Sequence, residues 1–134
     1  MINAYIITIK DNERSKRAAS RLSDSMPSNV SANTFDAIVP DQVDRIMKKY
    51  KLKWTWPWDK EEFNIKAGLL MRPYLTADPQ KRIGCFLSHY MLWERCVKNN
   101  EPIVIHEHDS IYFSNEHLPV HELEKSWYNI IGLN

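Results

Sequence analysis

Four side chains that can bind a metal or exchange protons stand together in the segment IVIHEHDSIYF: His106, Glu107, His108 and Asp109. They follow an apolar β-branched run, 103–105, which predicts a central strand that ends at this polar cluster. If the strand conformation continues, alternation places Glu107 and Asp109 on one side of the chain. Two carboxylates at this spacing suit Mg²⁺ or Mn²⁺, with coordination sites left for water and for the phosphates of a nucleotide diphosphate.

Two other interpretations of this cluster stay open. The imidazoles could be the primary ligands, with His106 and His108 joined by His117 or His121 around Zn²⁺. Alternatively, the acidic residues could simply begin a turn and cap the next segment, which is a common role for acidic residues after strands. The residue types and their spacing are compatible with all three interpretations.

The elements that must position this cluster alternate between strands and helices. The hydrophobic pattern predicts strands over 3–9, 30–38 and 102–106, and helices over 12–26, 40–52 and 80–100, the first capped by Asp11 or Asn12. A further helix from Pro119 and a strand over 127–134 follow, and the chain stops where another element would normally come next. Such alternation predicts a largely parallel, three-layer α/β sheet, in which ligands bind beyond the carboxyl ends of the strands.

Residues 54–79 interrupt this alternation, because they contain three prolines and irregular aromatic positions without a sustained period. A long connection inside a compact domain is commonly functional, so a substrate loop or lid competes with a plain linker. Just before and within it, five lysines accompany Tyr50, Trp54, Trp56 and Trp58. These aromatic side chains could stack on sugar faces, lie at a membrane surface, contact single-stranded nucleic acid, or pack beneath the loop.

The predicted helix over 80–100 carries two apolar stripes and is expected to be mostly buried. The stripes consist of Cys85, His89, Leu92 and Cys96, and of Phe86, Tyr90, Trp93 and Val97. The two cysteines lie about 16 Å apart along this helix, so they cannot form a disulfide with each other. Unpaired cysteines favour a reduced compartment, and we expect a cytoplasmic protein.

Length and composition predict one domain over residues 1–134. The chain has 134 residues, of which 43% are hydrophobic, so it can bury a real core. A formal net charge of +1 gives no reason to expect a nucleic-acid partner. The longest apolar runs fall well short of the roughly 20 residues of a membrane-spanning helix, and the first ten residues lack the features of a secretory signal.

Several segments resemble, in the same order, the bacterial lipopolysaccharide-type glycosyltransferases of family 25, which are related to procollagen galactosyltransferases. YIITIKDNER resembles the family's first strand with its following Arg, TFDAI its Phe-Asp-Ala strand, IGCFLSHYMLWERC its Gly-Cys-x-x-Ser-His helix, and WYNII its later Trp-Asp-Ile-Ile strand. IVIHEHDSIYF falls where the family has an apolar strand ending in Glu-Asp-Asp. His106 and His108 depart from that pattern, whereas Glu107 and Asp109 match it.

The resemblance implies a Rossmann-like, GT-A type nucleotide-sugar-binding fold, here incomplete at the C-terminus. It implies an inverting transfer from a nucleotide sugar, such as a UDP-sugar, to a glycan or lipopolysaccharide acceptor, with Mn²⁺ or Mg²⁺ held by Glu107 and Asp109. The implied nucleotide-sugar contacts are Thr8, Arg14, Asp36, Gly84, Ser88 and His89. The motifs do not identify the catalytic base that such a displacement requires.

Each implied contact has a structural alternative. Thr8 could be an ordinary strand residue, Arg14 a solvated helix residue, and Asp36 a turn cap. His89 could be a hydrogen-bonded core histidine, and Gly84 could serve close packing. The alternative function is correspondingly a non-catalytic nucleotide- or carbohydrate-binding module of the same fold.

Overall fold

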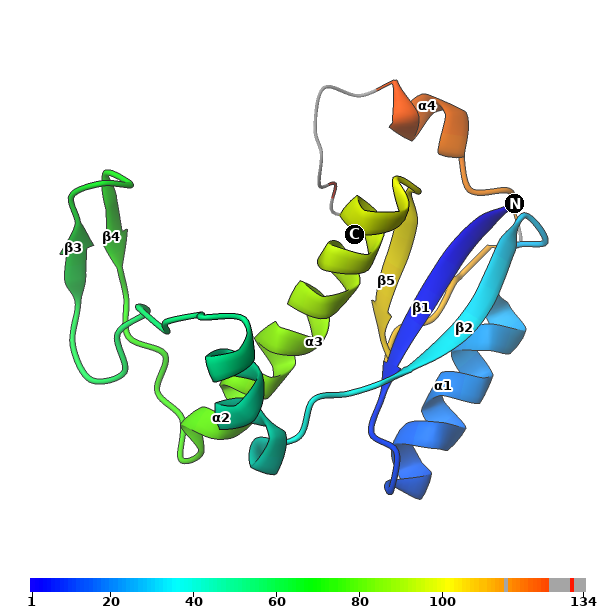
Figure 1. The fold of residues 1–134 in the computed structure, drawn as a ribbon. Helices are drawn as coiled ribbons and strands as arrows, with labels where there is room; N and C mark the ends of the chain where they lie inside the picture. Colours follow the sequence, from blue (N-terminus) through cyan, green and yellow to red (C-terminus); the bar gives the residue numbers. More distant parts are fainter. Residues whose placement is uncertain (115, 126–130, 132–134) are drawn as a thin grey trace. The chain divides into compact units, whose positions relative to one another are not determined.

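The computed structural model describes residues 1–114, 116–125 and 131 (Figure 1). Contacts divide the chain into two compact units, which we call the sheet unit (Met1–Asp36 and Arg95–Asn134) and the hairpin unit (Ala37–Glu94). Helix α3 (Pro79–Asn99) begins in the hairpin unit and ends in the sheet unit. A single functional domain over 1–134 stays a prediction.

Three parallel strands form the sheet of the sheet unit, in the order β2-β1-β5. The strands are β1 (Ile2–Thr8), β2 (Val30–Asp36) and β5 (Ile103–Glu107), and each lies within a residue or two of its predicted range. Helix α1 (Glu13–Ser25) connects β1 to β2 and lies beside the sheet in Figure 1. The predicted mixed α/β architecture with a parallel sheet is therefore confirmed, and it is compatible with a Rossmann-like fold.

Alternation along β1 builds the core of the sheet unit. Ala4 and Ile6 are buried, and Ile6 packs with Ala19 and Leu22 of α1. The intervening Tyr5 belongs to the opposite face of the strand, where the guanidinium of Arg95 lies 4.9 Å from its ring centroid. The helix and the strand are thus held together by small and branched apolar side chains.

The turn from β1 into α1 is fixed by two side chains. The carboxamide oxygen of Asn12 accepts a hydrogen bond from the backbone N–H of Ser15 (3.0 Å), which confirms the predicted N-cap. The buried Ser15 hydroxyl accepts in turn from the N–H of Ile9 (2.9 Å). These bonds hold the start of α1 directly after the carboxyl end of β1.

The hairpin unit contains a pair of strands that the sequence did not predict. Within 54–79, β3 (Glu62–Asn64) and β4 (Leu69–Met71) pair in antiparallel fashion. Gly68, with φ of +60°, and Asn64, whose side chain accepts from the N–H of Ala67 (3.0 Å), shape the turn between them. Three-residue strands are too short to display a hydrophobic period, which explains the omission.

The two helices of the hairpin unit lie where the sequence places them, with one correction. Helix α2 (Pro40–Lys49) begins at the predicted proline, and α3 begins at Pro79. The fully buried residues of α3 are Gly84, Leu87, Ser88 and Leu92, whereas four members of the expected stripes are only half-buried: Cys85, His89, Tyr90 and Cys96. Val97 is 81% exposed, and Phe86 and Trp93 are more than a third exposed, because these side chains lie on other faces of α3.

The C-terminal segment contains helix α4 (Val120–Glu124), which follows Pro119 as predicted. Residues 111–113 do not form the short strand that their composition suggested. The predicted strand over 127–134 falls almost entirely outside the described residues.

Candidate functional site

The carboxyl edge of the parallel sheet brings three of the predicted site residues together. The register pairs Thr8 with Asp36 and Ile7 with Glu107, so Asp36 and Glu107 end the strands on either side of β1, one residue apart in register and on opposite faces of the sheet. Neighbouring strands in a sheet lie about 4.8 Å apart. Two exposed carboxylates therefore flank the end of β1 at the position where α/β proteins bind ligands.

The acidic cluster forms a turn rather than an extension of β5. The strand ends at Glu107, and the N–H of Ser110 donates a hydrogen bond to the carbonyl of Glu107 (3.2 Å). The strand conformation therefore does not continue to Asp109, and the structure agrees with the alternative interpretation, in which the acidic residues begin a turn. Glu107 and Asp109 are nevertheless both exposed, and they belong to the same tight turn.

His106, one residue earlier, is fixed by a tyrosine. Its Nε2 lies 2.9 Å from the hydroxyl of Tyr112, and the N–H of Tyr112 donates to the hydroxyl of Ser25 (3.2 Å). Burial lowers the pKa of His106 and raises the pKa of Tyr112. The neutral imidazole of His106 and the neutral phenol of Tyr112 therefore form a hydrogen bond. Together with the bond from Tyr112 to Ser25, it connects β5 and the segment after it to the end of α1.

The zinc interpretation finds no support within residues 1–114 and 116–125. His106 bonds to Tyr112, whereas Nε2 of His117 lies 2.9 Å from the hydroxyl of Ser28. Among the described side chains, His106, His108, His117 and His121 form no grouping close enough to share an ion. The assignment of a divalent cation to Glu107 and Asp109 stays a prediction.

The segment after β1 supplies two cationic residues, of which only Arg14 was predicted to contact a ligand. Arg14 is exposed in the first turn of α1, and Lys10 lies 4.0 Å from Asp36 through its ammonium nitrogen. Thr8 itself is buried and its hydroxyl donates to the carbonyl of Ile6 (3.1 Å), which favours the ordinary strand role. The sequence could have identified Lys10 as a lysine that directly follows a predicted strand. Its ion pair with Asp36 could not be predicted, because that contact depends on which strands pair.

Gly84 and Ser88 of the Gly-Cys-x-x-Ser-His helix both lie against the backbone of Ile38. A Cβ at Gly84 would lie 2.5 Å from the carbonyl oxygen of Ile38, so no larger residue fits without movement. The Ser88 hydroxyl accepts from the N–H of Ile38 (2.9 Å) and donates to the carbonyl of Gly84 (2.8 Å). These contacts give both residues a structural role, and their part in ligand binding stays a prediction.

His89 and the tryptophans belong to an aromatic group in the hairpin unit. The ring of His89 lies 6.2 Å from that of Trp93. Trp54 and Trp58 stack with ring centroids 5.1 Å apart and planes 7° apart, and Trp54 also meets Phe86 edge to face. Trp54 and Trp58 are half-buried, so the tryptophans pack against their own unit in addition to facing solvent.

Comparison with known proteins supplies a family match. A family model described as glycosyltransferase family 25 (LPS biosynthesis protein) matches residues 1–131. No curated protein and no solved structure matches the chain significantly. None of the described helices combines the length and apolar character needed to cross a bilayer.

Proposed function

Because this chain belongs to glycosyltransferase family 25, we propose that it transfers a sugar from a nucleotide-sugar donor, such as a UDP-sugar, to a glycan acceptor. The family description points to lipopolysaccharide as the acceptor class. The observation that carries the proposal is the family match over nearly the whole chain, together with the polar residues at the carboxyl ends of the parallel strands. A GT-A type fold is part of this proposal.

The donor is proposed to bind at the carboxyl edge of the sheet unit. Arg14 and Lys10 follow β1 and carry positive charge that suits the diphosphate, and a guanidinium can bind phosphate through two parallel hydrogen bonds. Asp36 ends the adjacent strand and can accept hydrogen bonds from nucleoside hydroxyls. Binding at this edge orients the donor across the ends of β2, β1 and β5.

Glu107 and Asp109 fit a hard divalent cation, because both are exposed carboxylates within one turn. Bound there, Mn²⁺ or Mg²⁺ would offset the negative charge that develops on the leaving diphosphate. The neutral His106 beside this turn is engaged by Tyr112, so it holds the turn in place.

The proposed transfer is an inverting displacement. The acceptor hydroxyl oxygen bonds to the anomeric carbon while the bond from that carbon to the diphosphate oxygen breaks. The hydroxyl proton passes to a base, and the nucleoside diphosphate leaves with the bonding electrons. The described residues of the edge do not identify this base, and we assign the role to no residue.

A full-chain binding experiment tests the donor site first. UDP is titrated with and without Mn²⁺, using wild type, Glu107→Gln, Asp109→Asn and the control Asp24→Asn, which removes an exposed carboxylate from α1. We expect both site variants to weaken Mn²⁺-dependent UDP binding at least about tenfold, while the control binds like wild type. Unchanged binding in Asp109→Asn would refute the metal assignment.

Turnover separates the enzyme from the alternative, a non-catalytic binding module. Release of UDP from a panel of UDP-sugars is measured with and without glycan acceptors. An enzyme releases UDP and forms a glycoside, whereas a module binds UDP with Mn²⁺ and releases none. Binding without turnover over the whole panel would favour the module.

A further inference from the structure

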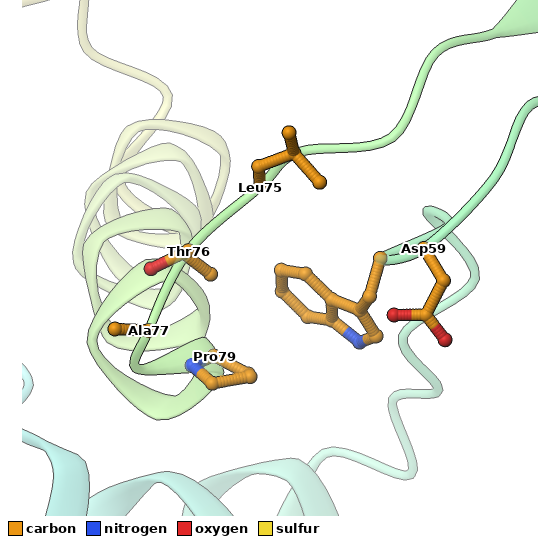
Figure 2. Close-up of a pocket in the computed structure, with 6 residues that line it drawn as sticks. Asp59, Leu75, Thr76, Ala77 and Pro79 are labelled. Atoms are coloured by element: carbon orange, nitrogen blue, oxygen red, sulfur yellow. The ribbon is translucent and has the colours of Figure 1, made fainter.

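A pocket lies within the hairpin unit, outside the residues assigned to the donor. It has a volume of about 610 Å³ and is lined by Trp58, Asp59, Leu75, Thr76, Ala77 and Pro79. Figure 2 shows Asp59 on one side of this space and the run from Leu75 to Pro79 curving around the other. The pocket opens widely to solvent, because all of its lining residues except the half-buried Trp58 are exposed, and its volume falls within the range of about 300–1,000 Å³ that small-molecule sites span.

Trp58 is the largest side chain in the lining and is held in place by other aromatic rings. It stacks on Trp54 with the planes 7° apart, and Trp54 meets the ring of Phe86 at 81°. The indole N–H of Trp54 donates to the carbonyl of Trp56 (2.9 Å). A platform of this kind loses little freedom when a ligand packs on it.

The two segments that line the pocket are joined next to it by hydrogen bonds. The indole N–H of Trp56 donates to the carbonyl of Arg72 (2.8 Å), and the N–H of Tyr74 donates to the carbonyl of Pro57 (3.2 Å). On the second wall, the Thr76 hydroxyl accepts from the N–H of Asp78 (3.2 Å). The lining segments therefore have a defined separation before any ligand arrives.

The chemistry of the lining selects a class of ligand. An aromatic ring beside a carboxylate and a hydroxyl suits a pyranose, whose C–H face packs on the ring and whose vicinal hydroxyls donate to the carboxylate. Asp59 is the only charged residue among the six that line the pocket. A carboxylate without a cation in the lining disfavours phosphates and acidic sugars, and with them the donor diphosphate.

We infer that this pocket is an acceptor subsite that binds one neutral pyranose of the glycan. Trp58 supplies the packing surface, Asp59 accepts hydrogen bonds from sugar hydroxyls, and Thr76 borders the opposite wall. The inference rests on the proposed function and extends it, because it gives the acceptor a position and a charge class. Asp59 is thereby a specificity-determining residue for uncharged sugars.

The test uses the full chain and simple glycosides as probes. Methyl β-D-galactopyranoside and methyl β-D-glucopyranoside are titrated by NMR against wild type, Trp58→Ala and Trp58→Phe. We expect Trp58→Ala to weaken binding of the preferred glycoside about tenfold and Trp58→Phe to retain most of it. The matched control is Phe63→Ala, since Phe63 is an exposed aromatic of the same unit that does not line the pocket.

Asp59→Asn should change which glycoside is preferred, and a variant that merely unfolds cannot bind one glycoside more strongly. We expect weaker binding of the neutral glycoside and stronger binding of methyl β-D-glucuronide, because the repulsion between two carboxylates is removed. Wild-type affinity for the neutral glycoside in Trp58→Ala, or an unchanged preference in Asp59→Asn, overturns the subsite. No binding of either neutral glycoside to wild type overturns it as well.

Donor measurements distinguish failure of the subsite from failure of the proposed function. Trp58→Ala and Asp59→Asn are expected to bind UDP with Mn²⁺ like wild type, because neither residue belongs to the sheet unit. Glycoside binding without any UDP binding by wild type would leave the subsite standing and refute the transferase. If wild type binds UDP and both variants bind the glycoside as wild type does, the subsite is refuted and the transferase proposal stands.

Discussion

The sheet unit and the hairpin unit obtain their structure in different ways. In the sheet unit, apolar side chains such as Ile6 and Leu22 form a core, and charged residues lie exposed at one edge. In the hairpin unit, side chains bind backbone directly, as Ser88 does at Ile38 and Trp56 does at Arg72. Regular alternation specifies the first unit, whereas individual close contacts specify the second.

This difference corresponds to the two ligands that we propose. A nucleotide diphosphate is recognised by charge, and the sheet edge offers Lys10, Arg14 and acidic residues on rigid elements. A neutral sugar is recognised by shape and hydroxyl contacts, which Trp58 and Asp59 offer in the hairpin unit. Substitutions in one unit should therefore affect one ligand and leave the other unchanged.

The largest effect is expected in the core of the sheet unit. Leu22 is fully buried against Ile6 and Ala19, so Leu22→Ala leaves a cavity and should lower the free energy of unfolding by about 3 kcal/mol. Urea denaturation measures the loss, and hydrogen exchange should show faster opening of β1. The control Ser20→Ala lies on an exposed position of α1 and should change little. A loss below about 1 kcal/mol would contradict a core centred on Leu22.

A smaller effect is expected at the close contact in the hairpin unit. Gly84→Ala places a methyl group 2.5 Å from the carbonyl of Ile38, and we expect a loss of about 2 kcal/mol. Ser88→Ala removes the acceptor for the N–H of Ile38 and should cost about 1 to 2 kcal/mol.

Gly68→Ala is the matched comparison for Gly84. Nothing lies within 4 Å of a Cβ there, and only the left-handed φ of +60° opposes the change, which should cost about 1 kcal/mol. Equal losses at Gly84 and Gly68, again from urea denaturation, would show that the approach of Ile38 does not govern this unit.

Much of the sheet unit could be predicted from the sequence. The β-branched runs ending at Thr8 and Glu107, and the cap at Asn12, each carry a local signal that the fold preserves. Parallel pairing then places Asp36 and Glu107 at one edge without further information. The turn at His108 was one of the interpretations left open, because acidic residues directly after a strand suit both a turn and a metal site.

The hairpin unit could be predicted only in part. Its helices follow from Pro40 and Pro79, but the buried face of α3 depends on which backbone approaches Gly84. No pattern in the sequence specifies that Ile38 is this neighbour. The stack of Trp58 on Trp54 is equally a tertiary contact, so the tryptophans could be identified as candidates but not assigned to a pocket.

The smallest effect on stability, at the sheet edge, should accompany a clear effect on ligand binding. Lys10 lies 4.0 Å from Asp36, and both side chains are about 70% exposed, so Lys10→Gln should leave the unfolding midpoint in urea unchanged within error. If Lys10 faces the donor diphosphate, the same variant should bind UDP several-fold more weakly and with less dependence on salt concentration.

A matched lysine separates this local effect from the net charge of the chain. Lys48→Gln removes the same charge from an exposed position on α2 in the hairpin unit, and UDP affinity should not change. Equal weakening by the two variants would mean that long-range charge, rather than the residues at the carboxyl edge of the sheet, attracts the diphosphate. Weakening by Lys10→Gln alone assigns donor recognition to the sheet unit, because only that variant alters the edge where β1 and β2 end.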